Sequence, residues 1–155
     1  MHPNLVILKC SNNQLMEYSF DNLPSGIEIL DCSYNELVNL DYLPPSIVKL
    51  NCSHNQIIQL DNLPCLMEYL TITSNPIVKL ENLPSSITYF KMVGCNKFKN
   101  KISNPHKMLE KVIIINNNTN NNELNNFITL PNIKSIIVGL HNDIIGINET
   151  KNLIK

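Results

Sequence analysis

Apolar and polar residues recur with a period of 20 along the first two thirds of the chain. Each copy has the form apolar-x-x-apolar-x-apolar-x-x-Asn-x-apolar, and a Leu-x-x-Leu-Pro segment follows it. Successive copies begin at Ile27, Ile47, Met67 and Ile87. An earlier copy begins at Leu5 and is longer than the others by two residues. Such strict self-similarity predicts a stack of identical supersecondary units rather than a conventional globular core.

The spacing inside each copy predicts one short strand and a return leg without α-helix. Side chains alternate along a strand, so positions 4 and 6 of a copy point inward while positions 3, 5 and 7 point outward. Stacked copies then form inward columns of apolar side chains, such as Leu30, Leu50 and Leu70. Because proline fixes φ and lacks an N–H, the Leu-Pro segment should be extended or polyproline-like.

This pattern resembles the leucine-rich repeat family. The resemblance implies a right-handed solenoid with a concave parallel sheet of about seven strands, an extended convex side and almost no α-helix. It also implies that the asparagines at position 9 hold the turn by bonding to backbone groups. These asparagines are Asn13, Asn35, Asn55 and Asn75. The repeat length and the Leu-Pro ending most resemble the short bacterial-type subclass known from secreted effectors, and the richness in Asn and Ile is similar to repeat proteins of giant viruses and other AT-rich genomes.

The chain should form one domain, 1–155, in two parts. Residues 1–98 hold the regular repeats, and residues 99–155 hold irregular repeats and a C-terminal cap. Two longer coils fit around Val112 and Ile136, separated by the Asn-rich tract 116–126. Residues 141–155 fit either a cap or a partial further coil.

Composition and charge narrow the class of partner. The formal net charge is −1 and the chain contains no Arg, so the sequence favours neither nucleic acid nor anionic membrane as a partner. Neither a signal peptide nor a membrane span is recognisable. The five Cys follow the repeat, which favours reduced thiols and an intracellular location, cytoplasmic and, for an effector-like or viral protein, in the host cytoplasm.

No residue pattern indicates catalysis, a cofactor, a metal or a small-molecule substrate. Cys10, Cys32 and Cys52 form a parallel column, which suits buried thiols better than a tetrahedral metal site. A second column, of acidic residues on the return leg, should bond to neighbouring backbone amides or be solvated; the alternative is a ladder of divalent cations. Its members are Asp21, Asp41, Asp61 and Glu81. We therefore predict that the protein is not an enzyme.

The outward strand positions are the predicted binding surface, because a stacked sheet offers rigid contact area. Tyrosines beside lysines in its middle, and isoleucines at its C-terminal end, are typical of protein interfaces. The predicted partner-binding residues are Tyr34, Lys49, His54, Tyr69, Tyr89, Lys91, Ile113, Ile115 and Ile137. The predicted function is protein–protein interaction; the alternative is a self-associating structural protein that dimerises through its open N-terminal edge or through the apolar concave patch.

Overall fold

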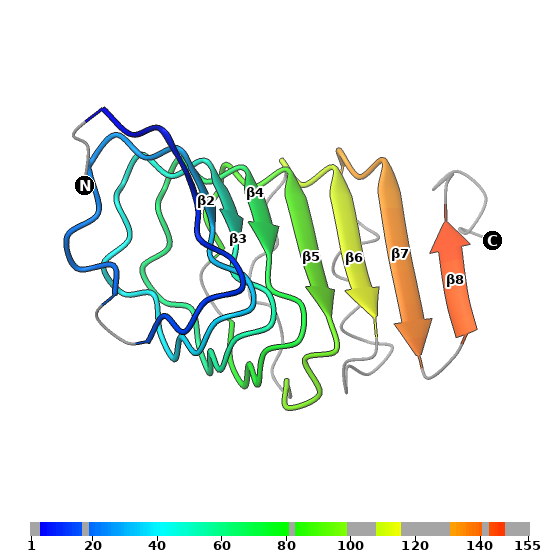
Figure 1. Cartoon of the computed structure of the whole chain (residues 1–155). Coiled ribbons are helices and arrows are strands. Elements are labelled where there is room, and N and C mark those ends of the chain that lie inside the picture. The colour runs from blue at the N-terminus through cyan, green and yellow to red at the C-terminus, as the bar shows by residue number, and fades with distance from the viewer. Residues whose placement is uncertain are drawn as a thin grey trace.

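A computed structural model describes residues 4–16, 19–80, 83–98, 108–115, 131–140 and 143–147. Within these ranges the chain forms one eight-stranded sheet in the order of the sequence, and no helix is present. The strands are β1 (Ile7–Lys9), β2 (Ile29–Asp31), β3 (Lys49–Asn51), β4 (Tyr69–Thr71), β5 (Tyr89–Val93), β6 (Lys111–Ile115), β7 (Ser135–Leu140) and β8 (Asp143–Ile147). Successive coils stack along one axis (Figure 1).

The predicted parallel sheet of seven strands is confirmed. Strands β1 to β7 pair in parallel, and each pairing brings equivalent repeat positions opposite one another, as in Leu30 opposite Leu50. The register offset is the 20-residue period from β2 to β5 and is longer at β1, β6 and β7. Strand β8 is different because it runs antiparallel to β7. A further coil of the same kind would add a parallel strand, so β8 is not the strand of such a coil.

The inward columns form the core. Leu30, Leu50, Leu70 and Phe90 are at most 2% exposed, and Cys32 and Cys52 are fully buried beside them. Leu8 in the first coil is only partly buried, because in the described part of the chain a neighbouring coil covers it on one side alone. Burial in this core therefore depends on stacking, as expected of a repeat protein.

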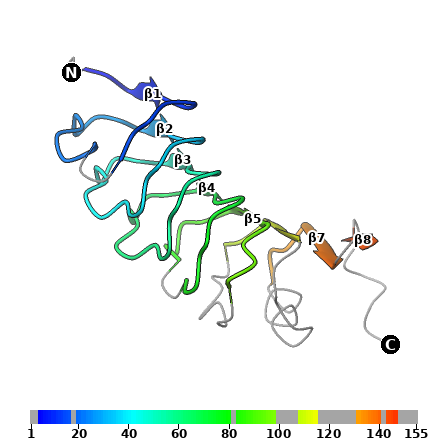
Figure 2. The same ribbon diagram turned by 60° about the horizontal axis from the view of Figure 1, so that its bottom comes forward.

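The return legs lie on the opposite side of each coil from the strands (Figure 2). The leg lacks α-helix, as predicted, but it is not uniformly extended. The N–H of Ile47 donates to the carbonyl of Pro44 at 3.2 Å, and the corresponding bond recurs in the coils before and after. Pro45 occupies the second position of this turn, where its fixed φ is favoured. The Leu-Pro segment therefore bends the chain back toward the next strand.

Asparagine amides connect each coil to the coil before it. The Oδ1 of Asn55 accepts from the N–H of Leu37, and its Nδ2 donates to the carbonyls of Cys32, Cys52 and Ser53 at 3.0–3.2 Å. Asn35 and Asn75 make the equivalent set of bonds, whereas Asn13 is exposed and its side chain donates, among the described residues, to carbonyls of its own coil. These side chains supply partners for backbone groups that the turn would otherwise bury unpaired.

The irregular part of the sequence is described only in its strands. The Asn-rich tract 116–126 and most of the insert between 97 and 106 lie outside the described residues, as does the end of the chain after 147. In the part that is described, no helix is long and apolar enough to cross a membrane.

Candidate binding surface

The solvent-facing side of the sheet, here called the strand face, consists of every second residue of each strand. It lies on the inner side of the bend of the coils (Figure 2). Parallel pairing in register brings the same repeat position of successive coils into rows across the strands. Residues about 20 apart in sequence are thus immediate neighbours. The side chains of one row therefore determine together what that part of the face can bind.

One row places two tyrosines between two lysines. Lys49, Tyr69, Tyr89 and Lys111 are successive partners on β3, β4, β5 and β6. The tyrosine rings stack with centroids 5.8 Å apart. The Nζ of Lys49 lies 4.6 Å from the Tyr69 centroid, and the Nζ of Lys111 lies 5.7 Å from that of Tyr89. We call these four residues the Lys–Tyr–Tyr–Lys row; each cation–π contact of this kind contributes about 0.5–1 kcal/mol at an exposed site.

The side chains of this row are accessible to solvent, and their contacts with one another hold them in place. Tyr69 is 39% exposed and both lysines are exposed, while Tyr89 is half-buried. Partial burial raises the pKa of the Tyr89 phenol, so the ring stays neutral through the physiological range. Lys91, the next outward residue of β5, is half-buried beside the row. The predicted residues of the middle of the sheet therefore lie together on one face.

Tyr34 and His54 form a second aromatic pair at the end of their strands. Their rings stack almost parallel, with centroids 4.1 Å apart and an interplanar angle of 8°. Both residues have positive φ, 55° and 54°. That conformation costs a residue other than Gly or Asn about 1 kcal/mol or more. The first and fifth coils place Asn12 and Gly94 at the same position, which are the residue types that tolerate it.

A shallow hollow lies beside Tyr69 on the strand face. It has a volume of about 200 Å³, and its lining includes Lys9, Asp31, Lys49 and Tyr69. The Oδ1 of Asp31 accepts from the Oγ of Ser33 at 2.6 Å and from the Nδ2 of Asn51 at 3.2 Å. These bonds fix the carboxylate in place.

The predicted apolar patch is less prominent than the sequence indicates. Ile113, Ile115 and Ile137 all lie on the strand face, but each is only partly exposed. Ile113 packs between Lys91 and Ile137 in its row. Ile113 and Ile137 therefore cover one another across β6 and β7.

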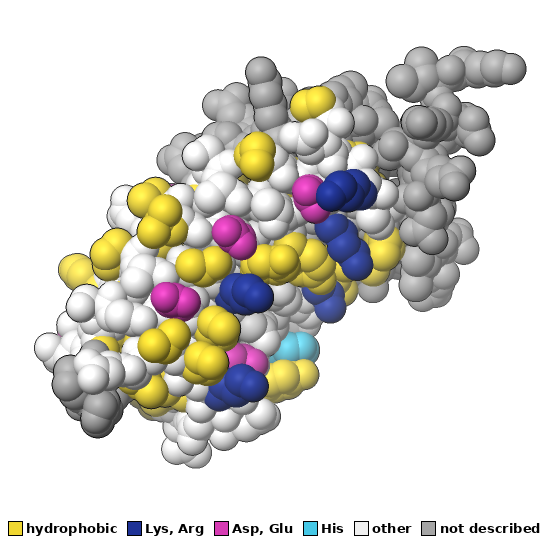
Figure 3. All heavy atoms as spheres, turned by 90° about the horizontal axis from the view of Figure 1, so that it is seen from above, with side chains coloured by type: hydrophobic (Ala, Val, Ile, Leu, Met, Phe, Trp, Pro, Cys, Tyr) yellow, Lys and Arg dark blue, Asp and Glu magenta, His cyan; other side chains and the backbone are white. Residues whose placement is uncertain are grey.

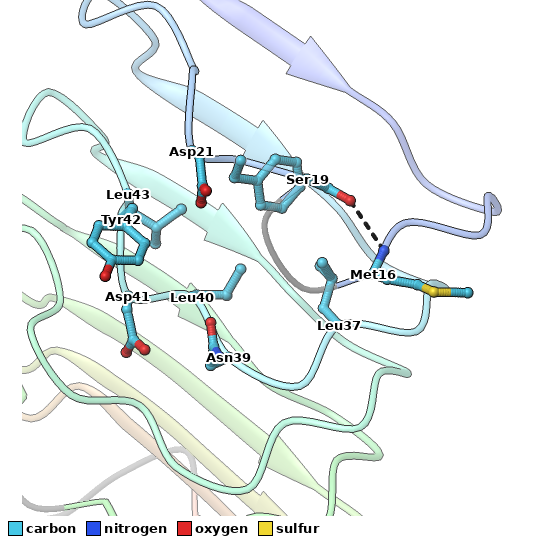
Figure 4. A pocket seen from close by; sticks show the side chains of 10 residues that line it. Met16, Ser19, Asp21, Leu37, Asn39, Leu40, Asp41, Tyr42 and Leu43 are labelled. Atoms are coloured by element: carbon cyan, nitrogen blue, oxygen red, sulfur yellow. Dashed lines mark hydrogen bonds between the residues drawn. The ribbon is translucent and has the colours of Figure 1, made fainter.

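A small cavity lies between the first coils on the convex side. Met16, Asp21, Leu40, Asp41 and Tyr42 are among the residues that surround a cavity of about 10 Å³ there (Figure 4), which is the room of roughly one water molecule. Glu81 of the acidic column lies outside the described residues. Among those described, no three His, Cys, Asp or Glu side chains come together as metal ligands would.

The buried thiols are chemically inert at neutral pH. All five cysteines are free, and Cys65 alone of them is exposed. Burial raises the pKa of Cys32 and Cys52 well above the ordinary value for a thiol, and raises the pKa of Cys95 to about 11. Cys95 occupies the asparagine position of its coil, and its Sγ donates to the carbonyl of Ile72 at 3.2 Å.

Sequence reasoning missed two features of the strand face. Lys111 was not among the predicted binding residues, although it completes the Lys–Tyr–Tyr–Lys row. Its register position, equivalent to Lys49 and Tyr69, was the available signal. The direct stack of Tyr34 on His54 was also missed, because it depends on the left-handed turn that follows each strand.

The repeat, the parallel sheet and the asparagine ladder define a solenoid of the leucine-rich repeat type. YopM from Yersinia enterocolitica WA-314, a leucine-rich repeat protein, has a similar structure, with a TM-score of 0.62 and 28% sequence identity. The match covers 74% of this chain but only 25% of YopM. No protein-family model matches the sequence, and a search of curated proteins finds no similar one. Solenoids of this type are generally scaffolds for protein interaction and are typically not catalytic.

Proposed function

We propose that this protein is a non-catalytic interaction module that binds a protein partner on its strand face. The Lys–Tyr–Tyr–Lys row carries the proposal. Tyrosine beside a cation is a frequent centre of binding energy in protein interfaces. The row lies on a stacked sheet whose backbone is already ordered, so binding there orders few additional groups.

Tyr34, His54 and Lys91 extend the proposed contact area around this centre, and Ile113, Ile115 and Ile137 supply apolar area at its C-terminal end. The proposal needs no cofactor, metal or small-molecule substrate, and it excludes nucleic acid and membrane as partners. The whole chain, 1–155, acts as one domain in it, with regular coils to residue 98 and a cap at the end.

We further propose that the chain belongs to the short, bacterial-type subclass of these repeats and acts inside a cell, in the host cytoplasm for an effector-like or viral protein. The 20-residue period and the likeness to part of YopM support the subclass. Fully buried free thiols at Cys32 and Cys52 support a reducing compartment, where such thiols persist.

The partner site can be tested with one exposed tyrosine on each face. A photo-crosslinking amino acid at position 71 on the strand face should capture the partner, whereas the same amino acid at position 42 on the return leg should not.

With the purified partner, Tyr69→Ala should weaken binding by about 30-fold, the effect of a hot-spot tyrosine worth roughly 2 kcal/mol. Tyr42 is 68% exposed on the convex side, so Tyr42→Ala is the matched control and should leave Kd unchanged. Equal losses in the two variants would exclude the strand face as the site.

Self-association is the second candidate function, and the first coil supports it. Val6 is 45% exposed and Ile7 is 49% exposed, and β1 has a paired strand on one side only within the described residues. An unpaired strand edge beside apolar side chains is a template for pairing with another chain. A second copy could meet this edge, or could cover the isoleucines at the other end of the face.

Light scattering after size exclusion distinguishes the two candidates. If the protein is a structural dimer, its mass should double between micromolar and near-millimolar concentration, and Ile7→Lys should return it to a monomer. A monomer at every concentration would leave only the binding of a different partner.

A further inference from the structure

The strand face carries an excess of positive charge although the whole chain has a net charge of −1. Lysine side chains run along this face, as Figure 3 shows in dark blue. The charged residues at outward positions of β1 to β6 are Lys9, Lys49, Lys91 and Lys111 against Asp31. Asp31 is already bonded to Ser33 and Asn51. A partner that is complementary in charge to this face therefore presents carboxylates to it.

We propose that the strand face binds an acidic peptide segment of its partner in an extended conformation, lying across strands β3 to β6. One carboxylate of the segment meets Lys49, and a second, four residues further along, meets Lys111. An apolar side chain midway between them packs on the rings of Tyr69 and Tyr89. This rests on the proposed function, because it names the chemistry of the partner at the same face.

The spacing of the row matches such a segment. Lys49 and Lys111 are separated by three steps between neighbouring strands, which amounts to about 14 Å. Residues i and i+4 of an extended chain lie on one face and are also about 14 Å apart. Residue i+2 faces the same way at the midpoint, over the two stacked rings. Carboxylates two residues apart would reach only half of this distance.

The side chains of the two lysines are already restricted before the peptide binds. Each amine lies over a ring, at 4.6 Å for Lys49 and 5.7 Å for Lys111, which restricts two otherwise flexible side chains. Neither lysine has an ion pair within the described residues, whereas Lys134 is bonded to Glu110 at 2.8 Å. Restriction before binding reduces the entropy that the complex loses.

A row of carboxylates beside the lysines favours a peptide over a nucleic acid. Glu28, Glu68 and Glu110 immediately precede β2, β4 and β6. Figure 3 shows carboxylates in magenta next to the lysines. A nucleic-acid strand carries a charge on every nucleotide and would lie against both rows. An extended peptide directs alternate side chains to opposite faces and can present its carboxylates to the lysines alone.

The test uses a fluorescein-labelled peptide containing Glu-Thr-Leu-Thr-Glu and the intact protein, followed by fluorescence polarisation and by amide NMR shifts. Wild type should bind this peptide about tenfold more tightly than the same peptide with Gln for Glu, and the difference should shrink as salt is raised. A peptide of equal composition with its two Glu only two residues apart should bind more weakly. NMR shifts should be confined to β3 to β6.

Charge reversal gives the decisive comparison. The double variant Lys49→Glu, Lys111→Glu should lose the acidic peptide and gain the peptide with Lys in place of Glu. Lys79→Glu, an exposed change of the same charge outside the strand face, should bind like wild type. Equal binding of the Glu and Gln peptides, or tighter binding of a single-stranded oligonucleotide that displaces the peptide, would overturn the proposal. A strand-face partner that is insensitive to charge reversal, while Tyr69→Ala still weakens it, would reject the acidic segment and leave the proposed function intact.

Discussion

Replacing Asn55 with Ala should lower the free energy of unfolding by about 2–4 kcal/mol, a large effect for one polar side chain. Asn55 is 8% exposed and makes four bonds to backbone groups of two coils. Alanine leaves the buried N–H of Leu37 without the Oδ1 that it donates to. The carbonyls of Cys32 and Cys52 each keep a bond from another asparagine, so the loss is concentrated at Leu37.

Asn13 is the matched control for this change. It has the same residue type and the same repeat position, but it is exposed, and its side chain donates to the carbonyls of Cys10 and Ser11 in its own coil. Because water can replace its bonds, Asn13→Ala should cost less than about 1 kcal/mol. Urea unfolding followed by circular dichroism gives both values. If the two variants lost equal stability, the connection between coils would not be the source of the asparagine contribution.

The sequence predicted the fold well because the features that define it repeat. Register follows from the period, since a one-residue slip would expose Leu50 and bury Lys49. The return leg was predicted less completely. Pro44 excludes helix, but the turn it forms with Ile47 depends on how the leg meets the next coil, and that contact is tertiary.

The sequence predicted which residues lie on the strand face, but not which of them contact one another. Alternation indicates that Tyr69 and Tyr89 point outward, and it does so correctly. Alternation does not reveal that Lys111 caps Tyr89, because the coil that carries Lys111 departs from the period. Its strand could be placed only by its apolar pattern. The left-handed conformation of Tyr34 could not be predicted from the sequence either. Other coils place Asn12 and Gly94 at the same position, and these residue types tolerate positive φ, but another coil places His54 there.

Raising the pH from 8 to 11 should destabilise the wild-type protein relative to Cys52→Ala by about 2–3 kcal/mol. Cys52 is fully buried, and burial raises its pKa far above the value of 9.0 for a free thiol. Above pH 9.0 the unfolded chain releases this proton while the folded chain retains it, so the unfolded state is favoured progressively. Each pH unit in that range costs about 1.4 kcal/mol for one such thiol.

The comparison isolates Cys52, because every other ionisable group is the same in the two proteins. Below pH 9 wild type should be the more stable, because alanine leaves a small cavity in the column between Cys32 and Ile72. As the pH rises the difference should shrink and then reverse. A wild-type advantage that stays constant to pH 11 would mean that Cys52 ionises as readily in the folded chain as in the unfolded one, and that water reaches the centre of the solenoid.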